Sequence, residues 1–146
     1  LLYGVRQGEG FVVITGDVMA DALQFAATKA SAQSDILHRL NLQPQRYLLA
    51  TVHRAENTDD PKHLINIMDA LTELAEEETV VLPLHPRTKK ILERTLNFEP
   101  RTLNLERSFL RIIDPLGYFD IIALEKSARM LLTDSGGMQK EAYWLN

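Results

Sequence analysis

The apolar run at residues 47–52, Tyr-Leu-Leu-Ala-Thr-Val, is the feature that most constrains how this chain can fold. A strand with one solvated face alternates apolar and polar residues, whereas this run is apolar almost throughout. Such a pattern is typical of a strand that is buried on both faces of a parallel sheet. The run therefore predicts a parallel sheet with helices on both sides.

Comparable runs recur along the chain, and segments with helical spacing separate them. Further strands are predicted at residues 11–15, 79–84, 110–113 and 128–133. Helices are predicted from Asp17 to about residue 40, as one helix or two, and over residues 58–78, 89–96, 118–126 and 138–145. The first helix is expected to carry one apolar face, formed by Val18, Ala22, Phe25 and Ala26. Alternating strands and helices indicate βαβ units, so the predicted fold class is α/β, an open parallel sheet with helices on both faces.

Composition narrows the possible partners. The chain has 146 residues, a net charge of −4 and no cysteine. Without a basic excess, nucleic acid is not an expected partner. No apolar run approaches the roughly 20 residues of a membrane span. We therefore expect a cytoplasmic protein without disulfides, thiol catalysis or thiolate metal sites.

Both ends of the chain interrupt a pattern. It begins abruptly at Leu1, and residues 138–146 stop inside an apolar helix without a stop signal. Residues 1–146 are therefore expected to be a domain that is truncated at its carboxyl end.

Polar residues gather where the predicted strands end, at residues 53–57, 85–88, 114–118 and 134–137. The carboxyl ends of parallel strands share one edge of the sheet, and ligands of open α/β sheets bind beyond that edge. The clusters together predict a ligand site there.

The cluster at residues 134–137, Asp-Ser-Gly-Gly, forms a turn between a strand and a helix. Gly136 and Gly137 let the backbone come close to a ligand, and the free N–H groups and dipole of a helix start favour a phosphate. Glu141, just over one turn later, is placed to accept hydrogen bonds from sugar hydroxyls. The alternative is a plain turn, in which Asp134 or Ser135 caps the helix and Gly137 allows close packing on the sheet.

The other polar clusters also have purely structural interpretations. His53 can serve as a cap of backbone groups, and His85 can have a structural role only. Residues 54–57 can form an internal loop network that orients the next helix. His53, His63 and His85 lack the i, i+4 spacing of a helical metal site, so no metal is expected.

Taken together, the segments at residues 14–23, 51–57, 83–88, 112–120 and 131–145 resemble the non-hydrolysing UDP-N-acetylglucosamine 2-epimerases. The most specific string is Asp-Ser-Gly-Gly-x-Gln-x-Glu at residues 134–141. Members of this family have two Rossmann-like domains in a glycosyltransferase-B-type arrangement, with the active site between them. The chain resembles most of the second domain, and the first is absent.

The resemblance implies an isomerase that interconverts UDP-N-acetylglucosamine and UDP-N-acetylmannosamine for polysaccharide biosynthesis, by eliminating UDP and adding it back, without a cofactor or metal. It assigns the diphosphate to Ser135, Gly136 and Gly137 and the ribose to Glu141. The full-length protein is expected to be a homodimer. The alternatives are a hydrolysing epimerase, a glycosyltransferase of the same fold and, for this chain alone, a UDP-binding half-site without activity.

The resemblance also implies further roles. It places the backbone around Leu116 and Ile121 beside the uracil and His85 beside the substrate as a catalytic residue. Arg54 corresponds to an arginine of a second, regulatory nucleotide-sugar site, although Ala55 replaces a second arginine common there. The residues that transfer protons at the sugar belong to the first domain.

Overall fold

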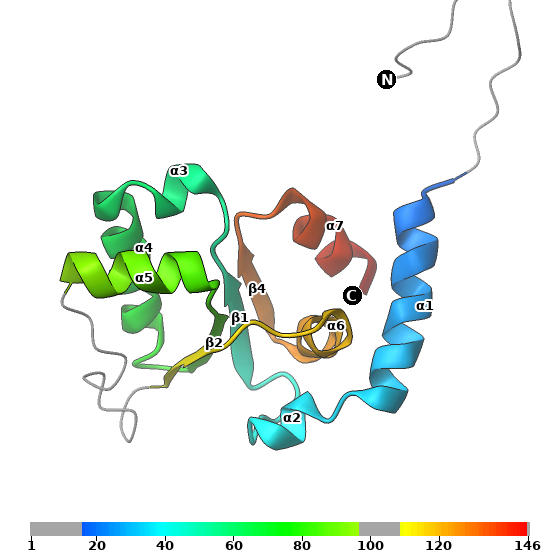
Figure 1. The fold of residues 1–146 in the computed structure, drawn as a ribbon. Helices are drawn as coiled ribbons and strands as arrows, with labels where there is room; N and C mark the ends of the chain where they lie inside the picture. The colour runs from blue at the N-terminus through cyan, green and yellow to red at the C-terminus, as the bar shows by residue number, and fades with distance from the viewer. Residues whose placement is uncertain (1–15, 97–108, 146) are drawn as a thin grey trace, which may run out of the picture.

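In the computed structural model, the structure describes residues 16–96 and 109–145. They form a four-stranded parallel sheet with helices on both faces (Figure 1). The strands are β1 (Tyr47–Thr51), β2 (Thr79–Pro83), β3 (Leu110–Ile113) and β4 (Met130–Thr133). The α/β fold class is confirmed, as are the strands predicted within the described residues. The strand predicted at 11–15 lies outside them.

The helices divide between the two faces of the sheet (Figure 1). One face is covered by α1 (Val18–Gln33), α2 (Ile36–Arg39), α6 (Tyr118–Ser127) and α7 (Gly136–Leu145), and the other by α4 (Pro61–Leu74) and α5 (Pro86–Leu96). A single short turn, α3 (Ala55–Thr58), follows β1. None of the helices in the described part of the chain is long and apolar enough to cross a membrane.

Strand β1 is buried over its whole length, as its apolar run predicts. Tyr47 and Leu49 belong to the core under α1 and α6, whereas Leu48 and Ala50 belong to the core under α4. Successive side chains of a strand point to opposite faces, so both cores need an apolar residue at alternate positions. This is the reason that the run is uninterrupted.

The predicted apolar face of the first helix is right for Ala26, which is buried, but wrong for the other three residues, which are exposed. Val18 is 75% exposed and Phe25 63% exposed, and Lys29 lies over the Phe25 ring. The buried residues of α1 are Leu23, Ala26, Ala27 and Ala30. The contribution of α1 to the core that it shares with α6 is thus mainly alanine, which allows close approach of the two helices. Large apolar residues remain on the outside.

Three helix starts differ from the sequence prediction. Helix α4 begins at Pro61 rather than at residue 58, α5 at Pro86 rather than at residue 89, and α7 at Gly136 rather than at residue 138. The short helix α3 is not predicted by the sequence. Proline is favoured in the first helical position because it lacks an N–H and has a fixed φ. Part of each polar cluster after the strands therefore already belongs to a helix.

The strand order is β3-β2-β1-β4. The chain builds outward from β1 through β2 to β3, and then returns to place β4 on the other side of β1. The direction of winding thus reverses between β1 and β4. In open α/β sheets, ligands bind beyond the carboxyl ends of the strands at such a switch point.

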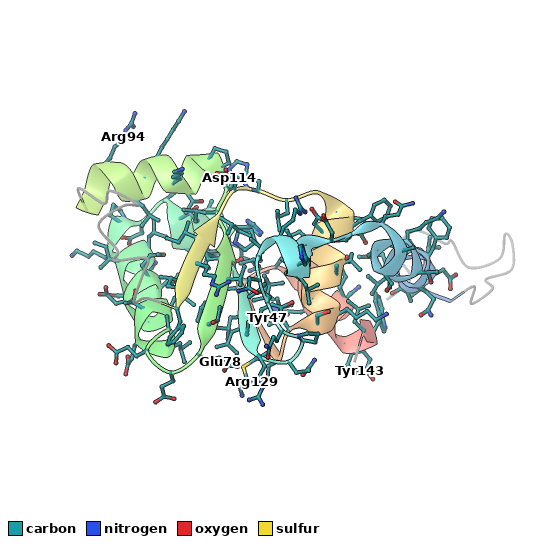
Figure 2. All side chains as sticks on the ribbon, turned by 90° about the horizontal axis from the view of Figure 1, so that it is seen from below. Tyr47, Glu78, Arg94, Asp114, Arg129 and Tyr143 are labelled. Atoms are coloured by element: carbon teal, nitrogen blue, oxygen red, sulfur yellow. The ribbon has the colours of Figure 1, made fainter. Side chains whose placement is uncertain are left out.

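Figure 2 separates the two ends of the strands: Asp114 lies at the carboxyl end, and Glu78 and Arg129 lie at the amino end. The guanidinium Nε of Arg129 donates to Glu78 Oε1 at 2.8 Å, and this bond lowers the pKa of Glu78. These two charges at the amino edge therefore pair with each other.

A carboxylate ties the two sides of the switch point together. Asp134, directly after β4, accepts hydrogen bonds from the backbone N–H of His53 at 3.0 Å and of Arg54 at 3.0 Å, and from Asn57 Nδ2 at 2.9 Å. Arg54 is the N-cap residue of α3 and has no side-chain cap of its own. Asp134 therefore holds the residues that open α3 from the end of another strand.

Burial alone would raise the pKa of Asp134, but the hydrogen bonds from Asn57, Arg54 and His53 outweigh it and hold the pKa below its ordinary value. A lowered pKa means that the ionised carboxylate stabilises the fold above the pKa of the unfolded chain. This contribution is lost as the pH falls through the folded-state pKa.

The hydrogen bonds that Asp134 accepts from His53, Arg54 and Asn57 are called the Asp134 clamp below. We expect Asp134→Asn to lower the free energy of unfolding by about 1–3 kcal/mol at pH 7, because the substitution removes one carboxylate oxygen and the negative charge from this clamp. At pH 3 and below, the difference should shrink as the wild-type carboxylate is protonated. Urea unfolding at both pH values measures it, with the exposed Asp69→Asn as control. Equal stability of Asp134→Asn and wild type at pH 7 would contradict the clamp.

Candidate functional site

The candidate site lies at the carboxyl edge, where four segments follow the four strands in spatial order β3, β2, β1 and β4. The segments after β1 and β4 border the switch point. His85 follows β2, so β1 lies between it and Ser135. At the usual strand spacing, β2 and β4 are about 10 Å apart.

Ser135 forms the entry into α7. Its Oγ accepts a hydrogen bond from the backbone N–H of Met138 at 3.4 Å, and its own N–H donates to Thr133 Oγ1 at 3.0 Å. The cap predicted in the plain-turn alternative is therefore confirmed for Ser135. A hydroxyl can donate a hydrogen bond while it accepts one. The Ser135 hydroxyl can therefore still donate a hydrogen bond in addition to forming this cap.

The two glycines are not required by packing within the described residues. A Cβ added to Gly136 would meet nothing within 4 Å, and one added to Gly137 would meet only Ser135 Oγ, at 3.7 Å. Neither glycine has a positive φ. The interpretation that Gly137 allows close packing on the sheet is thus wrong. The open space lies over the first N–H groups of a helix, which lack partners within the helix.

Glu141 lies half-buried one turn into α7. The hydroxyl of Tyr118, at the start of α6, donates to Glu141 Oε1 at 3.3 Å. This bond joins the segment after β3 to the helix after β4. Burial raises the pKa of Tyr118, and the neighbouring Glu141 carboxylate adds to the effect. The sequence placed Tyr118 in a polar cluster but offered no signal for this contact.

The two residues predicted beside uracil lie near this contact. Leu116 is in the loop between β3 and α6 and packs against the core under α1 and α6. Ile121 is half-buried in the first turn of α6, and its backbone N–H donates to the Gly117 carbonyl at 3.1 Å. That N–H is therefore already engaged within the helix.

His85 is exposed and directly precedes α5. Its Nδ1 lies 3.3 Å from the backbone N–H of Arg87 and accepts a hydrogen bond from it. An accepting Nδ1 places the proton of the neutral ring on Nε2. The structural alternative for His85 is thus confirmed, but it uses one ring nitrogen and leaves Nε2–H as a donor.

Arg87 has a partner of its own. Its guanidinium Nη2 donates to both carboxylate oxygens of Asp59, at 2.8 and 2.9 Å. Asp59 follows α3, so this ion pair connects the segments after β1 and β2. It accounts for Arg87 without a ligand.

Arg54 takes part in the loop network through its backbone N–H, which the Asp134 clamp uses. Its guanidinium pairs with Glu56 at 3.2 Å, and both side chains are exposed. Asn57 completes the internal network through Asp134, so the loop-network alternative is confirmed. Arg54 itself remains accessible at the edge.

A hollow of about 220 Å³ adjoins the clamp on the α4 side of the sheet. Its lining includes Asn57 and Asp134 at one end and Ile67, Leu71 and Leu132 in the interior. Ser135 and Gly136 do not line it. The hollow is mostly apolar and therefore unsuited to a diphosphate.

A family model and several known proteins match this chain over most of its length. The family model described as UDP-N-acetylglucosamine 2-epimerase matches residues 3–146. A UDP-N-acetylglucosamine 2-epimerase homolog of Methanococcus maripaludis is 47% identical over 97% of the chain. The UDP-2,3-diacetamido-2,3-dideoxy-D-glucuronate 2-epimerase of Pseudomonas aeruginosa is 41% identical over 94% of the chain. The chain spans only 38% and 37% of the lengths of these relatives.

Solved structures agree with the sequence relatives. The UDP-GlcNAc 2-epimerase of Methanocaldococcus jannaschii, solved in complex with UDP-GlcNAc and UDP, is 35% identical to the chain with a TM-score of 0.77. The match covers 91% of this chain and 36% of that one. A Rossmann-like α/β sheet, a glycine-rich helix start at its switch point and the match over residues 3–146 converge, and the chain belongs to the UDP-N-acetylglucosamine 2-epimerase family.

Proposed function

We propose that this chain is the UDP-holding half of a 2-epimerase that interconverts UDP-N-acetylglucosamine and UDP-N-acetylmannosamine. The observation that carries the proposal is the start of α7 at the switch point, where two glycines leave open space that the described residues do not use. Family membership and the UDP complex of a 35% identical structure support it. The proposal assigns the other half of the active site to a second domain, because this chain spans only 38% of the length of its relative.

UDP elimination requires a firm hold on the departing diphosphate, because the same UDP must be added back. In the proposed arrangement, the first N–H groups of α7 and the Ser135 hydroxyl hold the diphosphate. The Glu141 carboxylate accepts hydrogen bonds from the ribose, in place of or beside Tyr118. The backbone around Leu116 and Ile121 holds the uracil. The chain itself has a net charge of −4, so this attraction is local.

His85 contributes a fixed donor in this scheme. Because Nδ1 accepts from Arg87, the neutral ring offers Nε2–H to the oxygen on which negative charge develops as UDP leaves. A second proton on the ring would break the bond to Arg87. The arrangement thus favours a hydrogen-bond donor over a proton shuttle. Arg54 is assigned to a second nucleotide-sugar site at the same edge.

A second candidate substrate is a UDP-2,3-diacetamido uronate. The Pseudomonas aeruginosa relative that is 41% identical over 94% of the chain is a 2-epimerase of such a sugar. Both candidate substrates contain UDP, so the proposed UDP site can bind either one. The sugar is discriminated by groups beyond the diphosphate site.

The identity of the product distinguishes the candidate reactions. The complete polypeptide, incubated with UDP-N-acetylglucosamine, should yield UDP-N-acetylmannosamine, detected by anion-exchange chromatography and NMR of the sugar. The 146-residue chain alone should show no turnover. Free N-acetylmannosamine with released UDP would instead identify a hydrolysing enzyme. Turnover only with the diacetamido uronate would select the second substrate.

Gly137→Ala should separate stability from binding. The added methyl meets no obstacle in the fold, and alanine is the better helix former, so the free energy of unfolding should stay equal or rise by up to about 1 kcal/mol. UDP affinity should fall at least tenfold, because the methyl occupies the space of the diphosphate.

The control is Ala32→Gly on the exposed surface of α1. It should lower the free energy of unfolding and leave UDP affinity unchanged. Calorimetric titration with UDP measures both variants. Wild-type UDP affinity in Gly137→Ala would rule out the diphosphate placement.

Two substitutions of His85 test its roles separately. Asn retains an acceptor near Nδ1 and should preserve the α5 cap, whereas Gln extends an amide N–H toward the position of Nε2. In the complete enzyme, His85→Asn should keep its melting temperature and lose about 100-fold or more in kcat. His85→Gln should lose about 1 kcal/mol of stability with the cap but keep more of kcat. Full activity of His85→Asn would refute the donor role.

A further inference from the structure

Glu125, in α6, is an acidic residue with almost no access to solvent. It is 6% exposed, and both carboxylate oxygens lie buried without a hydrogen-bond partner among the described residues. An ionised carboxylate has about four acceptor positions, and leaving them empty away from water is costly. The fold therefore favours the neutral acid. Burial, with the nearby charge of Glu141, raises the pKa of Glu125 to about 8.

Glu125 lies on the face of α6 that is turned toward α7. It follows Tyr118 by seven residues, and residues with this separation lie on the same side of a helix. Tyr118 reaches across to α7 and donates to Glu141. The Glu141 carboxylate acts on both Tyr118 and Glu125. The three side chains therefore form one acidic cluster at the joint between α6 and α7.

The cations near α6 are engaged elsewhere. Lys29 of α1 lies over the Phe25 ring, and Lys126 of α6 donates to Ser31 of α1. Arg39 of α2 pairs with Asp120, on the first turn of α6.

The other groups named here beside α6 are neutral, apart from Glu141. The part of α1 that shares its core contributes Leu23 and alanines, and Tyr47 of β1 donates its hydroxyl to the Leu124 carbonyl. Glu141 is the charged group that acts on Glu125. Within the described residues, Glu125 thus faces a like charge and no compensating cation.

We propose that Glu125 is a positioning residue for Glu141: in its neutral form it lets α7 pack on α6 with the Glu141 carboxylate held at the ribose position, and its ionisation displaces Glu141 and weakens UDP binding. The inference rests on the proposed function, because it takes Glu141 as the ribose ligand. Two ionised carboxylates in this joint repel each other through a poorly solvated interior. UDP therefore binds the protonated protein more tightly, and UDP in turn strengthens the hold on the proton.

The test is the pH dependence of UDP affinity in the 146-residue chain and in Glu125→Gln. Gln has nearly the same shape and stays neutral, so its profile records the ionisation of UDP and of all other groups. Between pH 7 and pH 9, the wild-type Kd should rise about tenfold beyond any rise in Glu125→Gln, as expected for loss of one proton near pH 8. Superimposable profiles would overturn the inference and leave the proposed function standing. No UDP binding by wild type at pH 7 would overturn the proposed function, and the inference with it.

A second measurement needs no variant and so does not depend on the folding of Glu125→Gln. The side-chain carboxyl carbon of Glu125 can be followed by ¹³C NMR as the pH is raised, with and without saturating UDP. UDP should move the titration midpoint of Glu125 to higher pH. A midpoint that UDP leaves unchanged would show that Glu125 is not coupled to the site.

Discussion

The carboxylate of Asp134 joins the two loops that border the switch point of the sheet. From the end of β4 it accepts hydrogen bonds from the residues that follow β1, at 3.0 Å from the backbone N–H of both His53 and Arg54. Asp134 is also the residue before Ser135, so the same bonds fix where α7 begins. The position of the open helix start therefore depends on a tie between segments that lie about eighty residues apart in the sequence.

Further contacts extend this tie along the edge. Arg87 and Asp59 connect the segments after β2 and β1, and Tyr118 and Glu141 connect those after β3 and β4. Each of the four polar segments is thus bonded to another one. Within the described residues, groups suited to a nucleotide remain free at this edge: the N–H groups of Gly136 and Gly137, the space over these two glycines, and Nε2 of His85. Rigid ties and unused donors at one edge are the combination expected of a preorganised site.

The local pattern of apolar residues in the sequence predicted the strands and the fold class, because a strand buried on both faces needs apolar residues on both of them. It failed where contacts between distant segments decide the outcome. The short helix α3 has no side-chain cap, and its first residues are held by Asp134 from a distant segment. The inward face of α1 is set by close packing against α6, which selects Ala27 and Ala30 over Phe25. Glu125 carries no sequence signal at all, since an acid at a helical position usually indicates a solvated face.

The central claim is that the switch point holds UDP, and an NMR titration of the ¹⁵N-labelled chain with UDP tests it most directly. The amide signals of Ser135, Gly136 and Gly137 should shift together in a saturable way, with a single dissociation constant. The amide signals at the amino edge, around Glu78 and Arg129, should stay in place. Saturable binding that shifts the amino-edge signals, or leaves those of residues 135–137 unchanged at saturating UDP, would contradict the account.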